Sequence, residues 1–140
     1  MTKKIICAVD DSETSKGAAA FAAEMANAMG AELTLLAVNQ MIGGAGGKSD
    51  GNVYIWENAE LKGVLESAAS AAKQAGSVRT KTASINSRDV ARAIVTYAED
   101  NGADHIIVGT GGKGSVSRLM LGSVSRDVVF RAHCPVTVAR

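Results

Sequence analysis

The fold is decided by the stretch Ile106-Ile107-Val108-Gly109-Thr110-Gly111-Gly112-Lys113-Gly114-Ser115, in which a short apolar run enters a dense cluster of glycines. The segment 124–132 that follows has the residue pattern of a helix. A glycine-rich turn between a strand and a helix exposes backbone N–H groups beside the partial positive charge of a helix N-terminus, an arrangement that holds phosphate. The stretch therefore predicts an α/β protein with a phosphate-binding turn.

Outward from this stretch, short β-branched runs alternate with helical patterns along the whole chain. The expected strands are 4–9, 32–38, 78–85, 104–108 and 135–139. The expected helices are 13–29, 56–75, one that Ser87 caps and Asn101-Gly102 ends, and 124–132. Strands and helices in this order form βαβ units, and right-handed crossovers then favour a doubly wound, three-layer sandwich with a parallel sheet. No linker interrupts the 140 residues, so we expect a single domain over residues 1–140.

The first expected helix has clear signals at both ends. Asp11-Ser12-Glu13 supplies N-cap chemistry at its start, and Gly30 is a typical residue for its end. Apolar residues at helical spacing predict the buried stripe of this helix: Phe21, Met25, Ala28 and Met29.

Composition argues against several classes of protein. The net charge of +1 and the aromatic content of 4% give no indication of a nucleic-acid-binding surface. Apolar runs are strand-length, and the N-terminal run lacks a small-residue cleavage site, so neither a membrane span nor a signal peptide is expected. Cys7 and Cys134 do not make a disulfide framework, and we expect two buried, unreactive thiols in a cytoplasmic protein.

Three known phosphate-binding patterns can be tested against the glycines. Gly109, Gly111 and Gly114 satisfy the dinucleotide pattern G-x-G-x-x-G. That pattern also needs an acidic residue about 20 positions further on, at the end of the next strand. The next strand here ends in Val138-Ala139-Arg140, so the match is accidental.

The P-loop pattern G-x-x-x-x-G-K-[ST] also fails. Gly114 follows Lys113, where the pattern needs Ser or Thr. A near match at 43–49 ends in G-K-S, but Ile42 stands where the first glycine belongs, and Asp50-Gly51-Asn52 does not open a helix. We interpret the loop from 41 to 54 as a surface loop or lid.

The third pattern, G-x-x-G followed by nine residues and G-[ST], fits at every fixed position. Gly109 and Gly112 supply the first part, and Gly122-Ser123 follows after nine residues. This pattern resembles the ATP-binding branch of the universal stress protein family. The resemblance extends to four further segments in the order of the chain: the first strand with its terminal acid (5–12), the fourth strand (102–109), the start of the last helix (121–125) and the last strand (134–138).

The resemblance implies a five-stranded parallel sheet of order 3-2-1-4-5, Rossmann-like in class, with ATP bound where strands 1 and 4 separate. Gly109, Gly111 and Gly112 would then line the phosphates, while Gly122, Ser123, Val124 and Ser125 would offer N–H groups and hydroxyls. Ala8, Val38 and Val108 would border the adenine. Asp10 would contact the adenosine portion or help hold Mg²⁺ with the phosphates.

Each assignment has a structural alternative. Asp10 could cap the first helix, the glycines could serve tight turns alone, and Ser123 and Ser125 could simply start a helix. Many family members carry a larger polar or basic residue at the position of Gly111. Lys113 and Arg118 could supply that charge, or could be solvated.

For function, the resemblance implies an ATP-binding regulatory protein of the stress response. No paired carboxylates or activated nucleophile are evident, so we expect at most slow hydrolysis or autophosphorylation, with Ser115, Ser117 and Ser123 as candidate sites. An adenylate-forming enzyme of the related fold and a nucleotide-free structural dimer remain as alternatives. The apolar last strand, 135–139, is an unblunted sheet edge, which predicts a homodimer through that strand.

Overall fold

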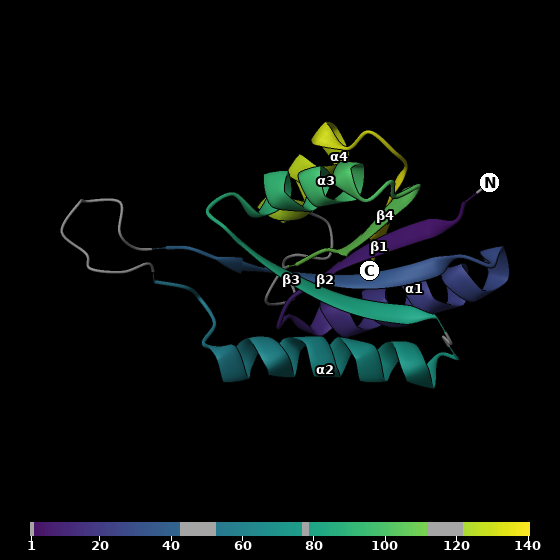
Figure 1. Cartoon of the computed structure of the whole chain (residues 1–140), viewed down its shortest axis with the longest axis horizontal. Helices are drawn as coiled ribbons and strands as arrows, with labels where there is room; N and C mark the ends of the chain where they lie inside the picture. The colour runs from purple at the N-terminus through teal and green to yellow at the C-terminus, as the bar shows by residue number, and fades with distance from the viewer. Residues whose placement is uncertain (1, 43–52, 77–78, 112–121) are drawn as a thin grey trace.

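The sheet and its four helices form three layers, seen edge-on in Figure 1. The structure is a computed structural model and describes residues 2–42, 53–76, 79–111 and 122–140. Helices α1 and α2 lie on one face of the sheet, and α3 and α4 lie on the other. The elements in chain order are β1 (Lys4–Val9), α1 (Glu13–Met29), β2 (Glu32–Gln40), α2 (Asn58–Gln74), β3 (Thr80–Ser87), α3 (Val90–Asp100), β4 (His105–Gly109), α4 (Ser123–Arg131) and β5 (Val136–Ala139).

The five strands are all parallel and lie in the order β3-β2-β1-β4-β5. Cys7 in the central strand β1 pairs with Leu35 of β2 on one side and with Ile107 of β4 on the other. The chain winds outward from β1 in one direction and from β4 in the other. The expected fold class and strand order are therefore confirmed, and the order reverses between β1 and β4, where α/β sheets usually bind ligands.

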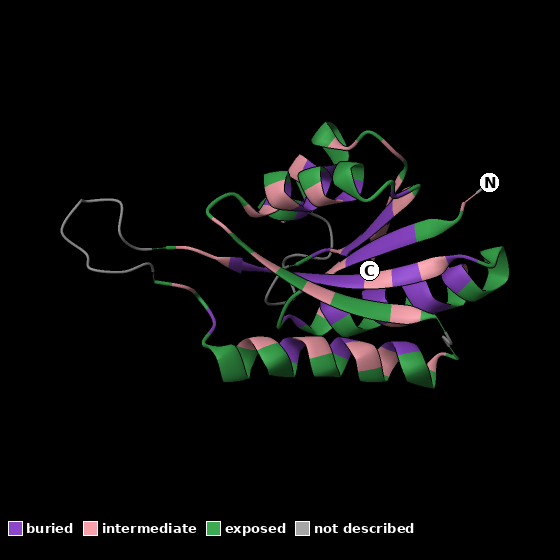
Figure 2. Ribbon diagram, in the orientation of Figure 1, coloured by how far each residue is buried: buried purple, intermediate pink, exposed green. Residues whose placement is uncertain are grey.

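Alternate residues of the central strands supply two separate cores, because successive side chains of a strand point to opposite faces. Ile5, Cys7 and Val9 face α1 and α2. Ile6 packs on the opposite face, together with Ile94 of α3. Figure 2 shows the buried colour concentrated along the central strands and on the inward faces of the helices.

The buried face of α1 differs from the expected one. Phe21 and Met29 are 40% and 44% exposed, Ala28 is exposed, and only part of Met25 is covered. The buried residues of this helix are instead small, namely Ser15, Ala18, Ala19, Ala22, Ala23 and Ala26. The helix contacts both the sheet and α2. Alanines allow this close approach on two sides, so helical spacing of the large residues gave the wrong face.

Most other elements begin or end one or two residues from the expected positions, and two of these differences are informative. β2 extends two residues beyond the expected end, to Gln40, which lengthens the wall of the crevice described below. Helix α3 is capped by Asp89, whose side chain accepts a hydrogen bond from the Arg92 N–H at 3.1 Å. Ser87 was the expected cap, but it ends β3, and its hydroxyl accepts from the Asp89 N–H at 3.1 Å. Ser and Asp are both common N-cap residues, so the sequence did not show which of Ser87 and Asp89 would cap the helix.

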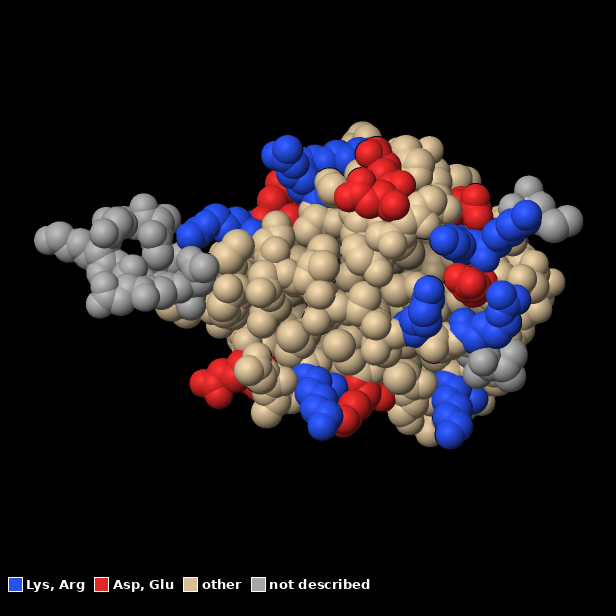
Figure 3. Space-filling model, viewed as in Figure 1, with Lys and Arg blue, Asp and Glu red and all other residues tan. Residues whose placement is uncertain are grey.

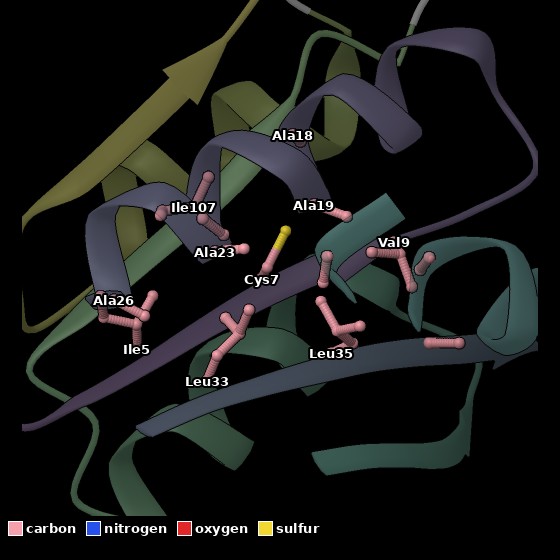
Figure 4. Packing of buried hydrophobic residues seen from close by; sticks show 14 of the residues in the cluster. Ile5, Cys7, Val9, Ala18, Ala19, Ala23, Ala26, Leu33, Leu35 and Ile107 are labelled. Atoms are coloured by element: carbon pink, nitrogen blue, oxygen red, sulfur yellow. The ribbon is translucent and has the colours of Figure 1, made fainter. Parts of the chain in front are cut away.

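The two cysteines are free, as expected, but they differ in burial. Figure 4 shows Cys7 pointing from β1 toward α1, among Ala19, Ala23 and Leu35. Burial in this apolar environment, with a smaller contribution from the charge of Asp10, raises the pKa of Cys7 to about 12. Cys134 is half-buried, which corrects the expectation of two buried thiols, and burial also raises its pKa.

We expect a thiol reagent at pH 8 to modify Cys134 and to leave Cys7 unmodified in the folded protein. The thiolate is the reactive form, and at pH 8 a thiol of pKa near 12 is ionised in about one molecule in ten thousand. Mass spectrometry after timed labelling measures this difference. In the Cys134→Ser variant, labelling should appear only after denaturation; equal labelling of both thiols in the native protein would contradict the buried position of Cys7.

No helix within the described ranges is long and apolar enough to cross a membrane. On the face shown in Figure 3, lysine and arginine side chains alternate with acidic ones near the margins, and the centre is uncharged. Glu32 illustrates this mixing, since it lies within 3.7 Å of Arg79 and 3.8 Å of Lys81.

Candidate functional site

A cavity of about 190 Å³ opens at the carboxyl ends of β1, β2 and β4. It lies at the point where the strand order reverses. Many of the residues expected at a nucleotide site line it, although they come from distant parts of the chain: Ala8, Asp10, Val38, Val108, Gly109, Gly111, Val124 and Ser125. Gly122 and Ser123 are at the adjacent start of α4, and Gly112 lies outside the described residues.

One part of this cavity is apolar. Val38 and Val108 are buried at 5% and 3% exposure, and Leu36 and Ile94 complete the surface with Ala8. The last residue pair between β1 and β2 is Val9 with Ala37, while β2 continues to Gln40. The backbone of β2 beyond Ala37 therefore faces the cavity on the side where β1 has ended. A flat apolar ring with polar edges, such as a nucleobase, suits this combination.

Asp10 stands at the end of β1 beside this apolar region. Its Oδ1 accepts hydrogen bonds from the Ser12 N–H at 2.8 Å and from the Ser12 hydroxyl. The Asp10 N–H donates to the Ser15 Oγ at 2.8 Å. Asp10 thus orders the turn into α1 through one oxygen, while its carboxylate is exposed at the cavity. Both the structural and the binding interpretations of Asp10 are compatible with this geometry.

Asp10 and Asp11 are the acidic side chains that line the cavity among the described residues. No group of three or more His, Cys, Asp or Glu side chains in these ranges comes together as a metal site. Carboxylate oxygens are suitable ligands for Mg²⁺, which commonly takes one or two carboxylates and completes its shell with phosphates and water. The donor set present here fits an ion that arrives with a nucleotide.

The glycines at the cavity are explained by close backbone contacts. A Cβ atom at Gly122 would lie 2.7 Å from the carbonyl oxygen of Thr110, to which the Gly122 N–H donates at 3.0 Å. A Cβ atom at Gly109 would lie 3.0 Å from the Thr14 Oγ1 and 3.2 Å from the Thr14 carbonyl oxygen. Gly111 has φ of +71°, which disfavours other residues. The two glycine elements of the sequence pattern therefore touch each other directly.

Helix α4 begins at this contact, with Gly122 as its N-cap residue. Ser123 is exposed, and Val124 and Ser125 line the cavity. The Ser125 hydroxyl donates to the Gly109 carbonyl oxygen at 2.6 Å, so its proton holds the end of β4 in place. Ser125 was expected to offer its hydroxyl to a ligand; in this arrangement only its lone pairs remain for that role. Lys113, Ser115, Ser117 and Arg118 lie outside the described residues.

A wall of the cavity that the sequence did not predict comes from Gln40, Ile55 and Trp56. The side chain of Asn39 fixes this wall: its Nδ2 donates to the Trp56 carbonyl at 2.9 Å, and its Oδ1 accepts from the Trp56 N–H at 3.1 Å. Trp56 is 6% exposed and packs into the core on the α1 and α2 side. The sequence signal that was available was Asn39 itself, an amide at the end of an apolar strand.

The chain is similar to known proteins over its whole length. The model of the universal stress protein family matches residues 1–140. A universal stress protein of Thermus aquaticus is 37% identical over the full length of both chains. A universal stress protein of Methanocaldococcus jannaschii is 33% identical, over 99% of this chain and 82% of that protein.

Solved structures agree with this relationship. The universal stress protein from Archaeoglobus fulgidus in complex with dAMP matches with a TM-score of 0.74 at 25% identity, over 99% of this chain and 98% of that chain. The sheet order, the family model and the full-length relatives together confirm the resemblance inferred from the glycine pattern. The chain belongs to the universal stress protein family.

Proposed function

We propose that this protein binds ATP in the cavity between β1 and β4 and acts as a nucleotide-dependent regulator in the stress response. The observation that carries the proposal is the contact between Gly122 and Thr110, which brings the start of α4 to the turn after β4. This contact places a helix N-terminus beside a glycine turn, at one end of an apolar cavity. The dAMP complex of the Archaeoglobus fulgidus protein supports an adenine nucleotide as the ligand.

The choice of a triphosphate rests on the glycine pattern, which resembles the ATP-binding branch of the family. The cavity runs from the apolar residues around Val38 and Val108, past Asp10, to Gly111 and the start of α4. A base at the apolar end and phosphates at the helix N-terminus would occupy both regions. We propose that Mg²⁺ enters with the phosphates and is held in part by Asp10. Regulation through binding, with slow hydrolysis or autophosphorylation at most, suits the side chains at the cavity.

Trp56 gives a direct test of this proposal, because it is the single tryptophan of the chain and lines the cavity. We expect saturable changes in its fluorescence on titration with ATP, and stronger binding of ATP than of NAD. Calorimetry of the same samples, with and without Mg²⁺, measures affinity independently. The Trp56→Phe variant should retain calorimetric binding without the optical signal. Failure of the wild-type protein to bind any adenine nucleotide in calorimetry would refute the proposal.

We further propose that two copies pair through β5. This strand is at the edge of the sheet, and all four of its residues are only partly buried. Helices α1 and α4 both contact β5. On α4, Phe130 is 80% exposed and Val129 is 42% exposed. An apolar edge strand is typical of a surface that another chain covers, and so are exposed apolar side chains on a helix that contacts it.

Light scattering after size-exclusion chromatography tests the dimer. We expect wild-type protein to elute at twice the chain mass of 14.3 kDa, and Phe130→Glu to shift the equilibrium toward the monomer. Met29→Glu is the matched control, because Met29 is an exposed apolar residue at the end of α1 that leads into β2. A wild-type monomer at all concentrations would rule out the dimer.

A further inference from the structure

A continuous chain of hydrogen bonds connects the carboxylate of Asp10 with the backbone of Gly111. The Gly111 N–H donates to the Thr14 Oγ1 at 3.2 Å. The Thr14 Oγ1 lies 3.2 Å from the Ser12 Oγ, and the Ser12 hydroxyl is bonded to the Asp10 Oδ1. Residues 10–12 form the turn from β1 into α1, Thr14 lies in the first turn of α1, and Gly111 follows β4. The chain therefore joins the two strand ends that border the cavity.

The direction of each hydrogen bond follows from the donors available. An ionised carboxylate only accepts, so the Ser12 hydroxyl donates to Asp10. Ser12 has a single hydroxyl proton, and therefore the Thr14 hydroxyl must donate to the Ser12 Oγ. Thr14 in turn accepts from Gly111. All donors point toward Asp10, and hydrogen bonds aligned in one direction polarise and strengthen one another.

Thr14 also lies against the end of β4. The Cβ position of Gly109 lies within 3.0 to 3.3 Å of the hydroxyl oxygen, carbonyl oxygen and carbonyl carbon of Thr14. Gly111 has positive φ, a backbone conformation that is strained for most residues. Glycine adopts it without strain, but loses conformational entropy when it is held there. A hydrogen bond from its N–H to a fixed hydroxyl holds this conformation. Thr14 is thus in contact with both ends of the turn 109–111.

We propose that Thr14 is a positioning residue that ties the turn at Gly111 to Asp10, so that the phosphate end and the nucleoside end of the cavity are set together. The inference rests on the proposed nucleotide site. Its first consequence concerns the free protein: a change at Asp10 should reach Gly111 through Thr14. Its second concerns binding: loss of the Thr14 hydroxyl should weaken the binding of ligands that carry phosphates and spare adenosine.

The first experiment needs no ligand. In ¹⁵N-labelled protein, we expect Asp10→Asn to shift the Gly111 amide resonance, because the carboxylate that ends the chain has lost its charge. In a Thr14→Val background the same change at Asp10 should leave that resonance unmoved, and in a Thr14→Ser background the shift should return. The inference would be overturned if Asp10→Asn left the Gly111 resonance unshifted. It would also be overturned if Asp10→Asn shifted that resonance equally in the Thr14→Val background.

The second experiment compares ATP and adenosine by calorimetry. One hydrogen bond contributes about 0.5–1.5 kcal/mol, so Thr14→Val should weaken ATP binding by about 2- to 13-fold and leave adenosine binding unchanged. Thr14→Ser should restore ATP binding, and Thr96→Val, at an exposed position in α3, should have no effect. Equal losses for both ligands, or no rescue by serine, would overturn the inference. If the Gly111 shifts occur as expected while the wild type binds neither ligand, the proposed function fails and the hydrogen-bonded chain stands.

Discussion

The Gly122→Ala variant is expected to lose most of its affinity for ATP and part of its stability. The added Cβ would lie 2.7 Å from the Thr110 carbonyl oxygen, a backbone atom that cannot rotate away. Either the turn after β4 or the first turn of α4 must then move. Such overpacking costs about 1–3 kcal/mol, which corresponds to about 5- to 150-fold in affinity where the displaced groups bind the ligand. Calorimetric titration with ATP and denaturant unfolding measure the two effects.

Gly17→Ala is the matched control. Gly17 lies within α1, and apart from the backbone of that helix no described residue has an atom within 4 Å of the position of an added Cβ. Alanine is favoured over glycine inside a helix, so this variant should gain about 0.5–1 kcal/mol of stability and bind ATP normally. Unchanged ATP affinity in Gly122→Ala would show that the contact with Thr110 has no part in binding.

The Asn39→Leu variant is expected to lower the free energy of unfolding by about 2–4 kcal/mol. Asn39 is 4% exposed, and its amide bonds both the N–H and the carbonyl of Trp56. Leucine is similar in size but makes neither bond, and each buried polar group left unpaired costs about 1–3 kcal/mol. Because Trp56 lines the cavity, its emission should also shift to longer wavelength as the wall loosens. Urea unfolding monitored by tryptophan fluorescence gives both quantities.

Gln40→Leu provides the comparison, since Gln40 is adjacent on β2 and also carries an amide. Its Nε2 makes one long bond, 3.4 Å, to the Arg88 carbonyl at an exposed position. Replacement there should change stability by about 0.5 kcal/mol or less. A similar loss in both variants would mean that leucine at the end of β2, and not the bond to Trp56, causes the destabilisation.

Much of the fold could be predicted because its signals are local. Each strand is a β-branched run, each helix has capping residues and glycine at or near its ends, and these patterns reflect interactions within a few residues. Errors arose where two local signals competed. Ser87 and Asp89 can both cap α3, and α1 contains both a row of alanines and a row of large residues at helical spacing. In each case a neighbouring strand or helix decided which was used.

The candidate site was predicted in part. Gly109 and Gly122-Ser123 follow a fixed spacing, and Asp10 ends a recognisable strand, so these positions could be chosen from the sequence. Whether they bind ATP stays a prediction. Trp56 was not among the predicted site residues, because nothing near it in the chain indicates that Asn39 holds it at the cavity. A contact between residues 17 positions apart, such as that of Asn39 with Trp56, produces no periodic pattern in the sequence.

By itself, the sequence determined the fold class, the strand and helix order, the family and the glycine positions, because all of these depend on residue type and spacing along the chain. Only the tertiary structure decided which helix faces are buried and why the glycines are required. Gly122 meets Thr110, and Gly109 meets Thr14 nearly a hundred residues earlier in the chain. These contacts form only when the sheet brings the ends of β1 and β4 together. Backbone atoms of distant segments then lie so close that there is no room for a side chain.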